Sequence, residues 1–313
     1  MKRIVSVSLG SSKRDHRVEL EFLGEQVTIE RIGTNGDLSK AIQMIEDLDG
    51  QVDAFGMGGI DLYLFAGNKR FTVKDAAKLA RAAKISPIVD GSGLKNTLER
   101  RVVHFLNERL NLNLKDKKVL MASGVDRFGM AQAFSSAGAD LVFGDLIFAL
   151  GIPVPIKTLR GLERLARTLL PVITKMPFQL LYPTGSKQDH YTPKYSQYYE
   201  AAEIIAGDFL YLKKYMPAKI SGKIIVTNTV TSADLEELKK REAALLVTST
   251  PEFSGRSFGT NVMEALMVSF SGKRPEELVE SDYLQLLEKM KFEPRVVKLD
   301  SFYSRESKEE ISI

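Results

Sequence analysis

A regular alternation of short apolar runs with segments of helical periodicity, along residues 119–248, constrains the fold more than any other feature of this chain. The run Ile224-Ile225-Val226 is apolar on both faces, as the strands of a buried parallel sheet are. We expect six strands, at residues 119–122, 141–143, 178–182, 203–206, 223–227 and 244–248. Strands that alternate with helices form parallel sheets covered on both sides. The sequence therefore predicts an α/β fold with a doubly wound parallel, Rossmann-type sheet.

The first third of the chain predicts a smaller N-terminal α/β domain. β-prone runs fill residues 2–32, with a hairpin at Gly24, and Asp37 is placed to cap a following helix. A polar connection at residues 111–117 puts the domain boundary near residue 115. The expected parts are an N-terminal α/β substrate domain at 1–115, a Rossmann-type dinucleotide-binding domain with C-terminal helices at 116–300, and a polar tail at 301–313.

The turn after the strand at 119–122 partly matches the G-x-G-x-x-G pattern of dinucleotide-binding loops. Gly124 and Gly129 hold its first and third positions, but Asp126 replaces the glycine that lets the backbone approach a pyrophosphate. Arg127 could offset that negative charge, or Asp126 could be the N-cap of the helix that starts near Phe128. We expect these five residues to contact the cofactor. The alternative is a purely structural glycine turn.

Asp145 supports the nucleotide hypothesis. It ends the strand at 141–143 and comes 21 residues after Gly124, near the spacing of the acid that binds the adenosine ribose. A carboxylate accepts hydrogen bonds from both ribose hydroxyls and repels a 2′-phosphate, so Asp145 favours NAD over NADP. The alternative is a solvated aspartate at a strand end.

Three residues are candidates for proton transfer. Hydride transfer involving an alcohol needs a group that moves the hydroxyl proton, and Lys, Asp and His can all do so. Lys69 and Asp90 follow turns of the first domain, and His190 lies in a polar loop of the second. For each, an ordinary surface residue is the alternative. The basic, hydroxyl-rich loop at 10–17 could bind a carboxylate, or it is a solvated hairpin end.

Composition excludes several classes of function. The chain has no cysteine, so disulfides, thiolate nucleophiles, iron-sulfur clusters and cysteine zinc sites are ruled out. The three histidines have no metal-ligand spacing, and we expect no metal. The net charge of +4 is spread along the chain, which argues against nucleic acid and fits a small anionic ligand. No apolar run approaches about 18 residues. We therefore expect a cytoplasmic protein without membrane contact. The sequence is also compatible with a homo-oligomer.

The order of parts resembles the shikimate and quinate dehydrogenases. The stretches Val7–Arg14 and Val89–Asn96 are similar to a bacterial family described as quinate 5-dehydrogenase. This resemblance implies oxidation of quinate to 3-dehydroquinate with NAD, by a Lys and Asp pair. The Asn-x-Thr-x-Pro-x-Lys and Asn-Thr-Asp runs of shikimate dehydrogenases do not occur in this sequence, so Lys69 and Asp90 are positional substitutes.

The leading hypothesis is an NAD-dependent oxidoreductase that acts on the hydroxyl of a small polyhydroxylated carboxylic acid. The replacement of a motif glycine by Asp126 supports an alternative, a catalytically inactive Rossmann-like metabolite-binding or sensor protein. A third hypothesis is a non-redox enzyme whose substrate is a nucleotide or an acyl carrier.

Overall fold

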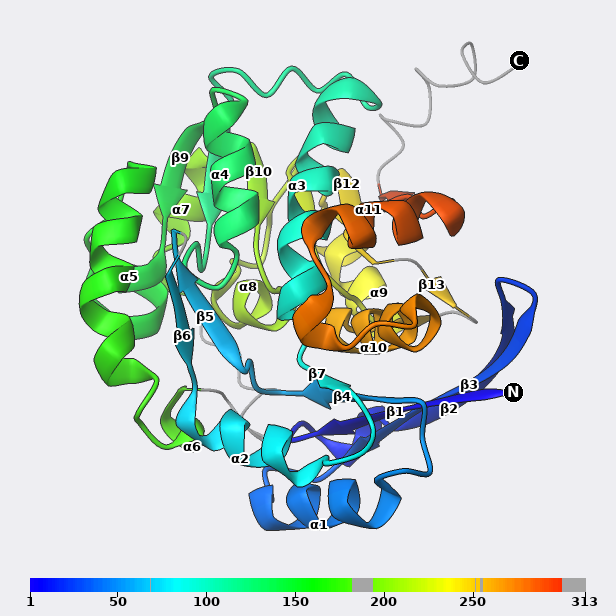
Figure 1. Cartoon of the computed structure of the whole chain (residues 1–313). Coiled ribbons are helices and arrows are strands. Elements are labelled where there is room, and N and C mark those ends of the chain that lie inside the picture. The colour runs from blue at the N-terminus through cyan, green and yellow to red at the C-terminus, as the bar shows by residue number, and fades with distance from the viewer. Residues whose placement is uncertain (68, 182–193, 251, 254–255, 300–313) are drawn as a thin grey trace, which may run out of the picture. The chain divides into compact units, whose positions relative to one another are not determined.

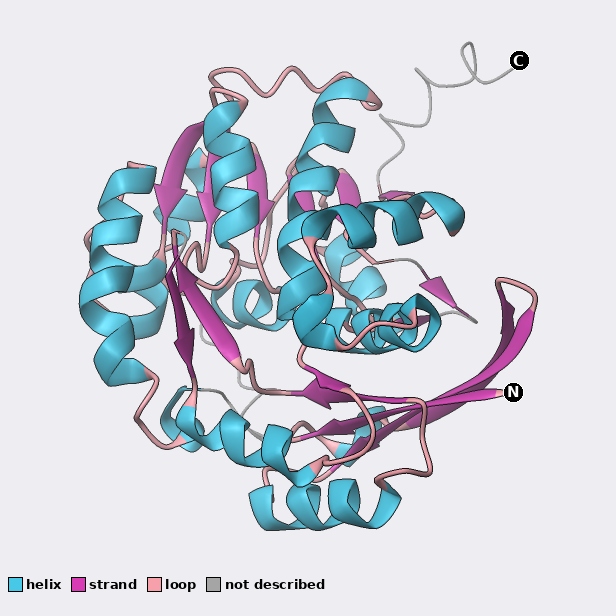
Figure 2. Ribbon diagram, viewed as in Figure 1, coloured by secondary structure: helices cyan, strands magenta, loops and turns pink. Residues whose placement is uncertain are grey.

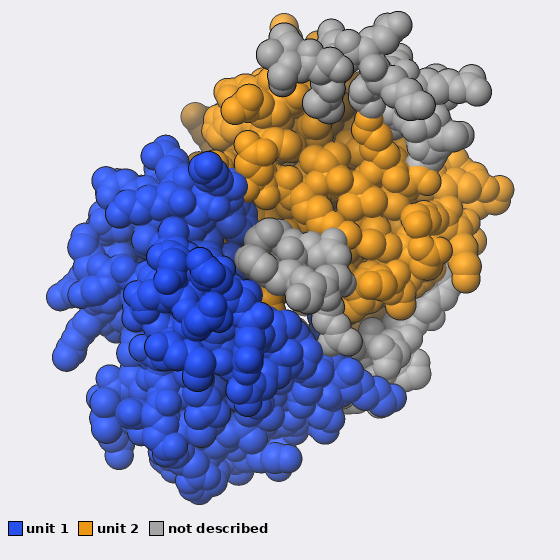
Figure 3. Space-filling view, turned by 90° about the vertical axis from the view of Figure 1, so that its right-hand side faces the viewer, with its two compact units in different colours: residues 1–97, 165–189, 259–292 blue, residues 98–164, 190–258, 293–313 orange. Residues whose placement is uncertain are grey.

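The computed structural model describes residues 1–67, 69–181, 194–250, 252–253 and 256–299. It is a mixed α/β protein with parallel sheets (Figure 2), which confirms the predicted fold class. The chain divides into two compact units, coloured separately in Figure 3. Unit 1 comprises residues 1–97, 165–189 and 259–292, and unit 2 comprises residues 98–164, 190–258 and 293–313.

Both units are discontinuous in sequence, whereas the sequence predicted contiguous domains. The predicted boundary near residue 115 falls inside unit 2, and segments 165–189 and 259–292 belong to unit 1. The physical reason is that strand and helix patterns are local. They indicate what a segment forms, but they carry no signal for the sheet against which it packs.

Unit 1 contains a five-stranded sheet in the order β2-β3-β1-β4-β7 (Figure 1). The strands are β1 (Lys2–Ser8), β2 (His16–Phe22), β3 (Glu25–Gly33), β4 (Ala54–Gly58) and β7 (Ile88–Val89). β2 is antiparallel to β3, and the other pairs are parallel. The predicted hairpin at Gly24 is confirmed, because Leu23 and Gly24 join β2 to β3 with φ of 49° and 81°.

Helices cover both faces of the unit 1 sheet (Figure 1). α1 (Leu38–Leu48) and α2 (Lys74–Ala82) bury apolar side chains with β1 and β4, and α10 (Thr260–Ser271) lies on the opposite face. Asp37 caps α1 as predicted, accepting a hydrogen bond from the Lys40 N–H at 2.9 Å. The remaining elements are η1 (Ser12–Arg14), the hairpin β5 (Tyr63–Ala66) and β6 (Lys69–Thr72), α6 (Phe178–Leu181), η4 (Pro275–Glu277) and α11 (Glu280–Lys289).

Unit 2 contains a six-stranded sheet in the order β15-β12-β11-β10-β8-β9. The strands are β8 (Lys118–Met121), β9 (Asp140–Phe143), β10 (Ile204–Ala206), β11 (Ile224–Thr227), β12 (Leu245–Thr248) and β15 (Arg295–Lys298). β15 runs antiparallel to β12, and the other pairs are parallel. The strand predicted at 178–182 is wrong, because Phe178–Leu181 is helical. A short apolar run does not by itself distinguish a strand from a buried helix.

Both faces of the unit 2 sheet are buried, as in a doubly wound fold. Val119 and Met121 of β8 pack with α3 (Ser92–Glu108) and α4 (Phe128–Ser136). Leu120 and Ala122 pack on the other face with α7 (Ser196–Ala201), α8 (Phe209–Tyr215) and α9 (Ser232–Lys240). The unit also contains η2 (Asp145–Ala149), the start of α5 (Leu159–Ile173), β13 (Glu252–Phe253) and β14 (Arg256–Ser257).

The order of the parallel strands locates a crevice in unit 2. Numbered along the chain from β8 to β12, they lie in the order 2-1-3-4-5, so the connections reverse direction between β8 and β10. Ligands of open α/β sheets bind outside the carboxyl ends of the strands at such a switch point. Dinucleotide-binding sheets have a third strand beyond the second, but here β9 is the edge strand. Among the described helices, none is long and apolar enough to cross a bilayer.

Candidate functional site

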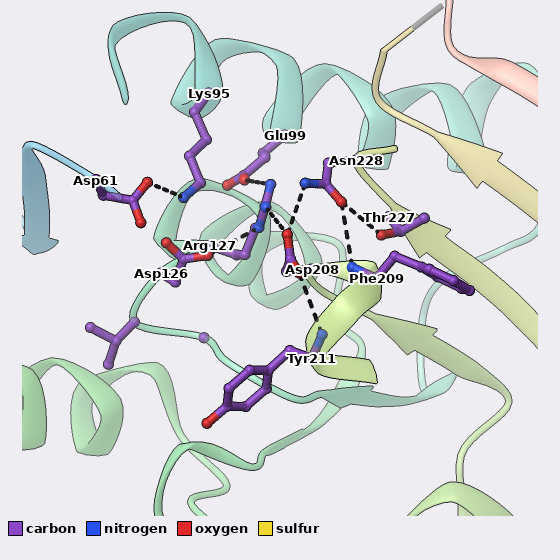
Figure 4. A network of polar contacts seen from close by, with 12 residues as sticks. Asp61, Lys95, Glu99, Asp126, Arg127, Asp208, Phe209, Tyr211, Thr227 and Asn228 are labelled. Atoms are coloured by element: carbon purple, nitrogen blue, oxygen red, sulfur yellow. Dashed lines mark hydrogen bonds and ion pairs between the residues drawn. The ribbon is translucent and has the colours of Figure 1, made fainter. Parts of the chain in front are cut away.

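Arg127 lies at the switch point of unit 2, directly before α4, and its side chain is 5% exposed. Its guanidinium donates to Glu99 Oε1 at 2.8 Å and to Asp208 Oδ2 at 3.3 Å. Its Nε lies 3.3 Å from Asp126 Oδ2 (Figure 4). Glu99 comes from α3, and Asp208 follows β10. One buried cation therefore holds three carboxylates from three separate segments together.

The Arg127 cluster, which consists of Arg127, Glu99, Asp126 and Asp208, is net acidic. Burial alone would lower the pKa of Arg127, but the charges of Glu99, Asp126 and Asp208 raise it above its ordinary value. The guanidinium is therefore permanently charged. Three carboxylates against one guanidinium leave an excess of negative charge. The side chains of Asp126 and Asp208 are 24% and 32% exposed, so this excess reaches the surface.

Asp208 is also the N-cap of α8. Its Oδ1 accepts hydrogen bonds from the Leu210 and Tyr211 N–H groups at 3.0 and 3.4 Å. Its Oδ2 accepts a hydrogen bond from Asn228 Nδ2 at 2.9 Å. The Asn228 amide oxygen in turn accepts from the Thr227 hydroxyl at 3.1 Å. These bonds fix the polar groups after β10 and β11 in one orientation, as Figure 4 shows.

Asp145 binds the loop that the sequence assigned to a pyrophosphate. Its Oδ2 and Oδ1 accept hydrogen bonds from the Gly124 and Val125 N–H groups at 3.0 and 2.9 Å. The residue is 8% exposed, and burial raises the pKa of its carboxyl to about 6 despite these bonds. Two amides of the turn after β8 are therefore bonded to this chain's own carboxylate.

The other predicted loop residues have packing roles. A Cβ on Gly124 would lie 2.6 Å from Phe143 and 2.8 Å from Leu162, so the packed side chains require glycine there. Phe128 and Gly129 are buried in the first turn of α4. The N-cap of α4 is Arg127, without a side-chain cap bond. The alternative that Asp126 caps this helix is wrong, because Asp126 lies one residue too early and is paired with Arg127.

The structure does not bring Lys69 and Asp90 together in unit 1. Asp90 is 9% exposed and accepts hydrogen bonds from the Leu62 N–H at 2.6 Å and the Ser92 N–H at 3.1 Å. Lys69 is exposed and pairs with Ala66 at the far end of the β5–β6 hairpin. Asp90 is bonded just before the start of β5, whereas Lys69 lies opposite Ala66. Ala66 is three residues from the first residue of β5, about 10 Å along the strand. His190 lies outside the described residues.

A half-buried Lys–Asp pair that the sequence analysis missed lies elsewhere in unit 1. Lys95 Nζ in the first turn of α3 is 3.5 Å from Asp61 Oδ1, and the two side chains are 13% and 22% exposed. Asp61 is the last residue of the glycine-rich segment at residues 56–61, which begins in β4. The three glycines of this segment are the sequence signal for a turn that other groups approach closely. In the ranges that the structure describes, no three His, Asp or Glu side chains could hold a metal ion.

The chain belongs to a family described as Domain of unknown function (DUF8754), whose model matches residues 93–299. A second model, Domain of unknown function (DUF8753), matches residues 3–90. No curated protein matches the chain. Neither family description names a dehydrogenase, so the resemblance to quinate 5-dehydrogenase stays a prediction.

Solved structures with a similar arrangement have very different sequences. A glucose-galactose binding protein from Geobacillus stearothermophilus is 10% identical with a TM-score of 0.39, over 96% of this chain and 98% of that one. A galactofuranose binding protein is 15% identical with a TM-score of 0.37, over 93% and 99%. An NAD-dependent malic enzyme from Thermotoga maritima is 13% identical with a TM-score of 0.34, over 93% and 84%. At these TM-scores the similarities carry no argument about function.

Proposed function

We propose that this chain is a small-molecule-binding α/β protein whose unit 2 binds a polyhydroxylated ligand at the switch point between β8 and β10. The observation that supports this proposal is the Arg127 cluster, in which a guanidinium that is 5% exposed holds partly exposed carboxylates at the carboxyl edge of the sheet. This is the metabolite-binding alternative that the sequence raised, with a defined location.

The chemistry of the cluster favours a neutral ligand rich in hydroxyls. Carboxylate and amide oxygens accept hydrogen bonds from hydroxyl groups, and bonds to charged groups are the stronger ones. Asp126, Asp208 and Asn228 supply such groups after β8, β10 and β11. Because Arg127 and the α8 amides already fix Asp208, little side-chain entropy is lost on binding. The excess negative charge would repel the anionic ligand that we expected from the sequence.

Ligand-induced thermal stabilisation tests the proposal. The full chain would be mixed with a panel of pentoses, hexoses, inositol, quinate and NAD. A ligand at 100 times its Kd stabilises by about 2.7 kcal/mol, or roughly 4 °C in a chain of 313 residues. We expect a neutral polyol to shift the melting temperature, and Asp126→Asn to weaken its binding about tenfold or more.

Asp140→Asn is the matched control, because Asp140 is an exposed aspartate at the opposite, amino-terminal edge of the same sheet. The control variant should bind as the parent does. Equal binding by both variants, or no stabilisation by any neutral polyol, would show that the Arg127 cluster is only structural.

NAD binding by the Gly124 loop is the second candidate, and the loop fits a dinucleotide poorly. The Gly124 and Val125 amides are bonded to Asp145, and Asp126 adds negative charge beside them. The Lys95–Asp61 pair nevertheless favours an enzyme, since a lysine beside a carboxylate can exchange a proton with a substrate hydroxyl. Turnover of quinate with NAD, abolished by Lys95→Met but not by Lys84→Met at an exposed position, would support this candidate.

A further inference from the structure

Arg31 is a partly buried cation at the carboxyl ends of β1 and β3 in unit 1, and its side chain is 14% exposed. Its Nη1 donates to Asp15 Oδ1 at 2.7 Å and to the Ser11 carbonyl at 3.1 Å. Its Nη2 donates to the Ser8 hydroxyl at 3.0 Å. Arg31 is therefore oriented by the loop at residues 10–15, which connects β1 to β2.

The loop is built to lie close over Arg31. A Cβ on Gly10 would lie 2.9 Å from Arg31 Nη2, and a Cβ on Gly33 would lie 2.7 Å from the Ser11 carbonyl. Asp15 Oδ1 also accepts a hydrogen bond from the Gly33 N–H at 2.7 Å. Ser12 is held by the turn that follows β3, because its N–H donates to Asn35 Oδ1 at 2.8 Å. These contacts hold the loop residues in a fixed position around the Arg31 guanidinium.

The loop and Arg31 together carry more positive than negative charge. Lys13 and Arg14 lie in η1, and Arg14 is close enough to act on Arg31, whose pKa is lowered to about 10 by burial and next by the Arg14 charge. Asp15 is the carboxylate bonded to Arg31. Three cations against one carboxylate leave two excess positive charges. Two like-charged guanidiniums repel each other unless an anion lies near both.

We propose that the loop at residues 10–15 of unit 1 binds a phosphate dianion or a phosphate monoester at Arg14 and Arg31. A dianion matches the two excess charges that Lys13, Arg14, Asp15 and Arg31 carry together, whereas a single carboxylate would neutralise only one. Guanidinium groups are also suited to phosphate, because their planar N–H groups donate to two oxygens at once. The site uses unit 1 alone, so it does not depend on the ligand proposed for the Arg127 cluster.

Titration with inorganic phosphate tests the site. Calorimetry on the full chain, near neutral pH and at constant ionic strength, would compare sodium phosphate with sodium acetate. We expect saturable binding of phosphate and at least several-fold weaker binding of acetate. Arg14→Gln should weaken phosphate binding about tenfold or more, because one charged hydrogen-bonding group is lost.

Arg17→Gln is the matched control, since Arg17 lies three residues after Arg14 and the substitution removes the same charge. The Arg17 side chain pairs with Glu19 at 2.9 Å instead. It should bind phosphate like the parent. Arg31→Lys, which keeps the charge but loses the guanidinium, should also weaken binding. The amide resonances of Gly10 and Gly33 should shift on titration. Equal phosphate affinity in the Arg14 and Arg17 variants, or equal affinity for acetate and phosphate, would overturn the proposal.

Discussion

The two sheets of this protein share the order of four parallel strands but differ in what occupies the switch point. In unit 1 the parallel strands β1, β3, β4 and β7 are arranged in the same relative order as β8, β9, β10 and β11 of unit 2. At the switch point between β1 and β4, backbone of two loops packs closely, because a Cβ on Gly59 would lie 2.9 Å from the Gly10 nitrogen. The reversal between β8 and β10 holds the Arg127 cluster instead.

This difference explains the two glycine-rich turns. Gly59, directly after β4, allows two loops to approach each other closely. The glycine after β8 makes room for Phe143 and Leu162. Topology therefore locates a crevice in each sheet, but the side chains decide whether polar groups are presented there.

The largest expected effect is the loss of Arg127. Arg127→Met leaves Glu99, Asp126 and Asp208 without their shared cation, and we expect unfolding to become easier by about 3–5 kcal/mol. Denaturant unfolding measures this. Arg160→Met, at an exposed position in the first turn of α5, is the control and should change stability little. Similar unfolding midpoints for the two variants would contradict a central role for the cluster.

A backbone substitution tests unit 1 in the same assay. Gly59→Ala adds a methyl group at φ of 74°, against the Gly10 backbone, and we expect a loss of about 2–4 kcal/mol. Gly24→Ala is the matched control, because its φ is also positive, at 81°, but no atom of the described residues lies within 4 Å of an added Cβ. The control should lose only about 1 kcal/mol. Equal losses would show that the loop contact contributes nothing.

The smallest expected effect is a difference in pH dependence between two buried carboxyls. In unit 1, Glu264 is 3% exposed and Tyr283 donates to its Oε1 at 2.6 Å. Its Oε2 has no hydrogen-bond partner among the residues that the structure describes. Burial, with the nearby charge of Asp90, raises the pKa of Glu264 to about 8, whereas that of Asp145 in unit 2 is raised to about 6.

Between its ordinary pKa and its raised value, each carboxyl keeps its proton in the folded chain and loses it on unfolding. The resulting stability is therefore complete below the ordinary pKa and is lost as pH rises through the folded value. We expect stability to fall by up to about 1.4 kcal/mol per pH unit for each group. The fall in stability caused by Asp145 should be complete near pH 6, and the fall caused by Glu264 should be complete near pH 8. Glu264→Gln should flatten the curve between these values, and an unchanged slope in that variant would refute the assignment.

The sequence by itself determined the local structure. The β2–β3 hairpin, the Asp37 cap of α1 and the strands of the parallel sheet follow from turn residues, capping residues and periodicity, which act over a few positions. It also located the Gly124 turn and Asp145, but it gave Asp145 a ligand as partner. The structure pairs that carboxylate with the turn's own amides.

Tertiary structure decided the strand order, the unit to which each segment belongs and the composition of the site. Phe178–Leu181 became a helix of unit 1, and β15 completed the unit 2 sheet from the far end of the chain. Arg127 meets Asp208 across 81 residues. No local pattern encodes such a pairing, because the cost of burying a charge and the partner that offsets it are set only when distant segments pack together.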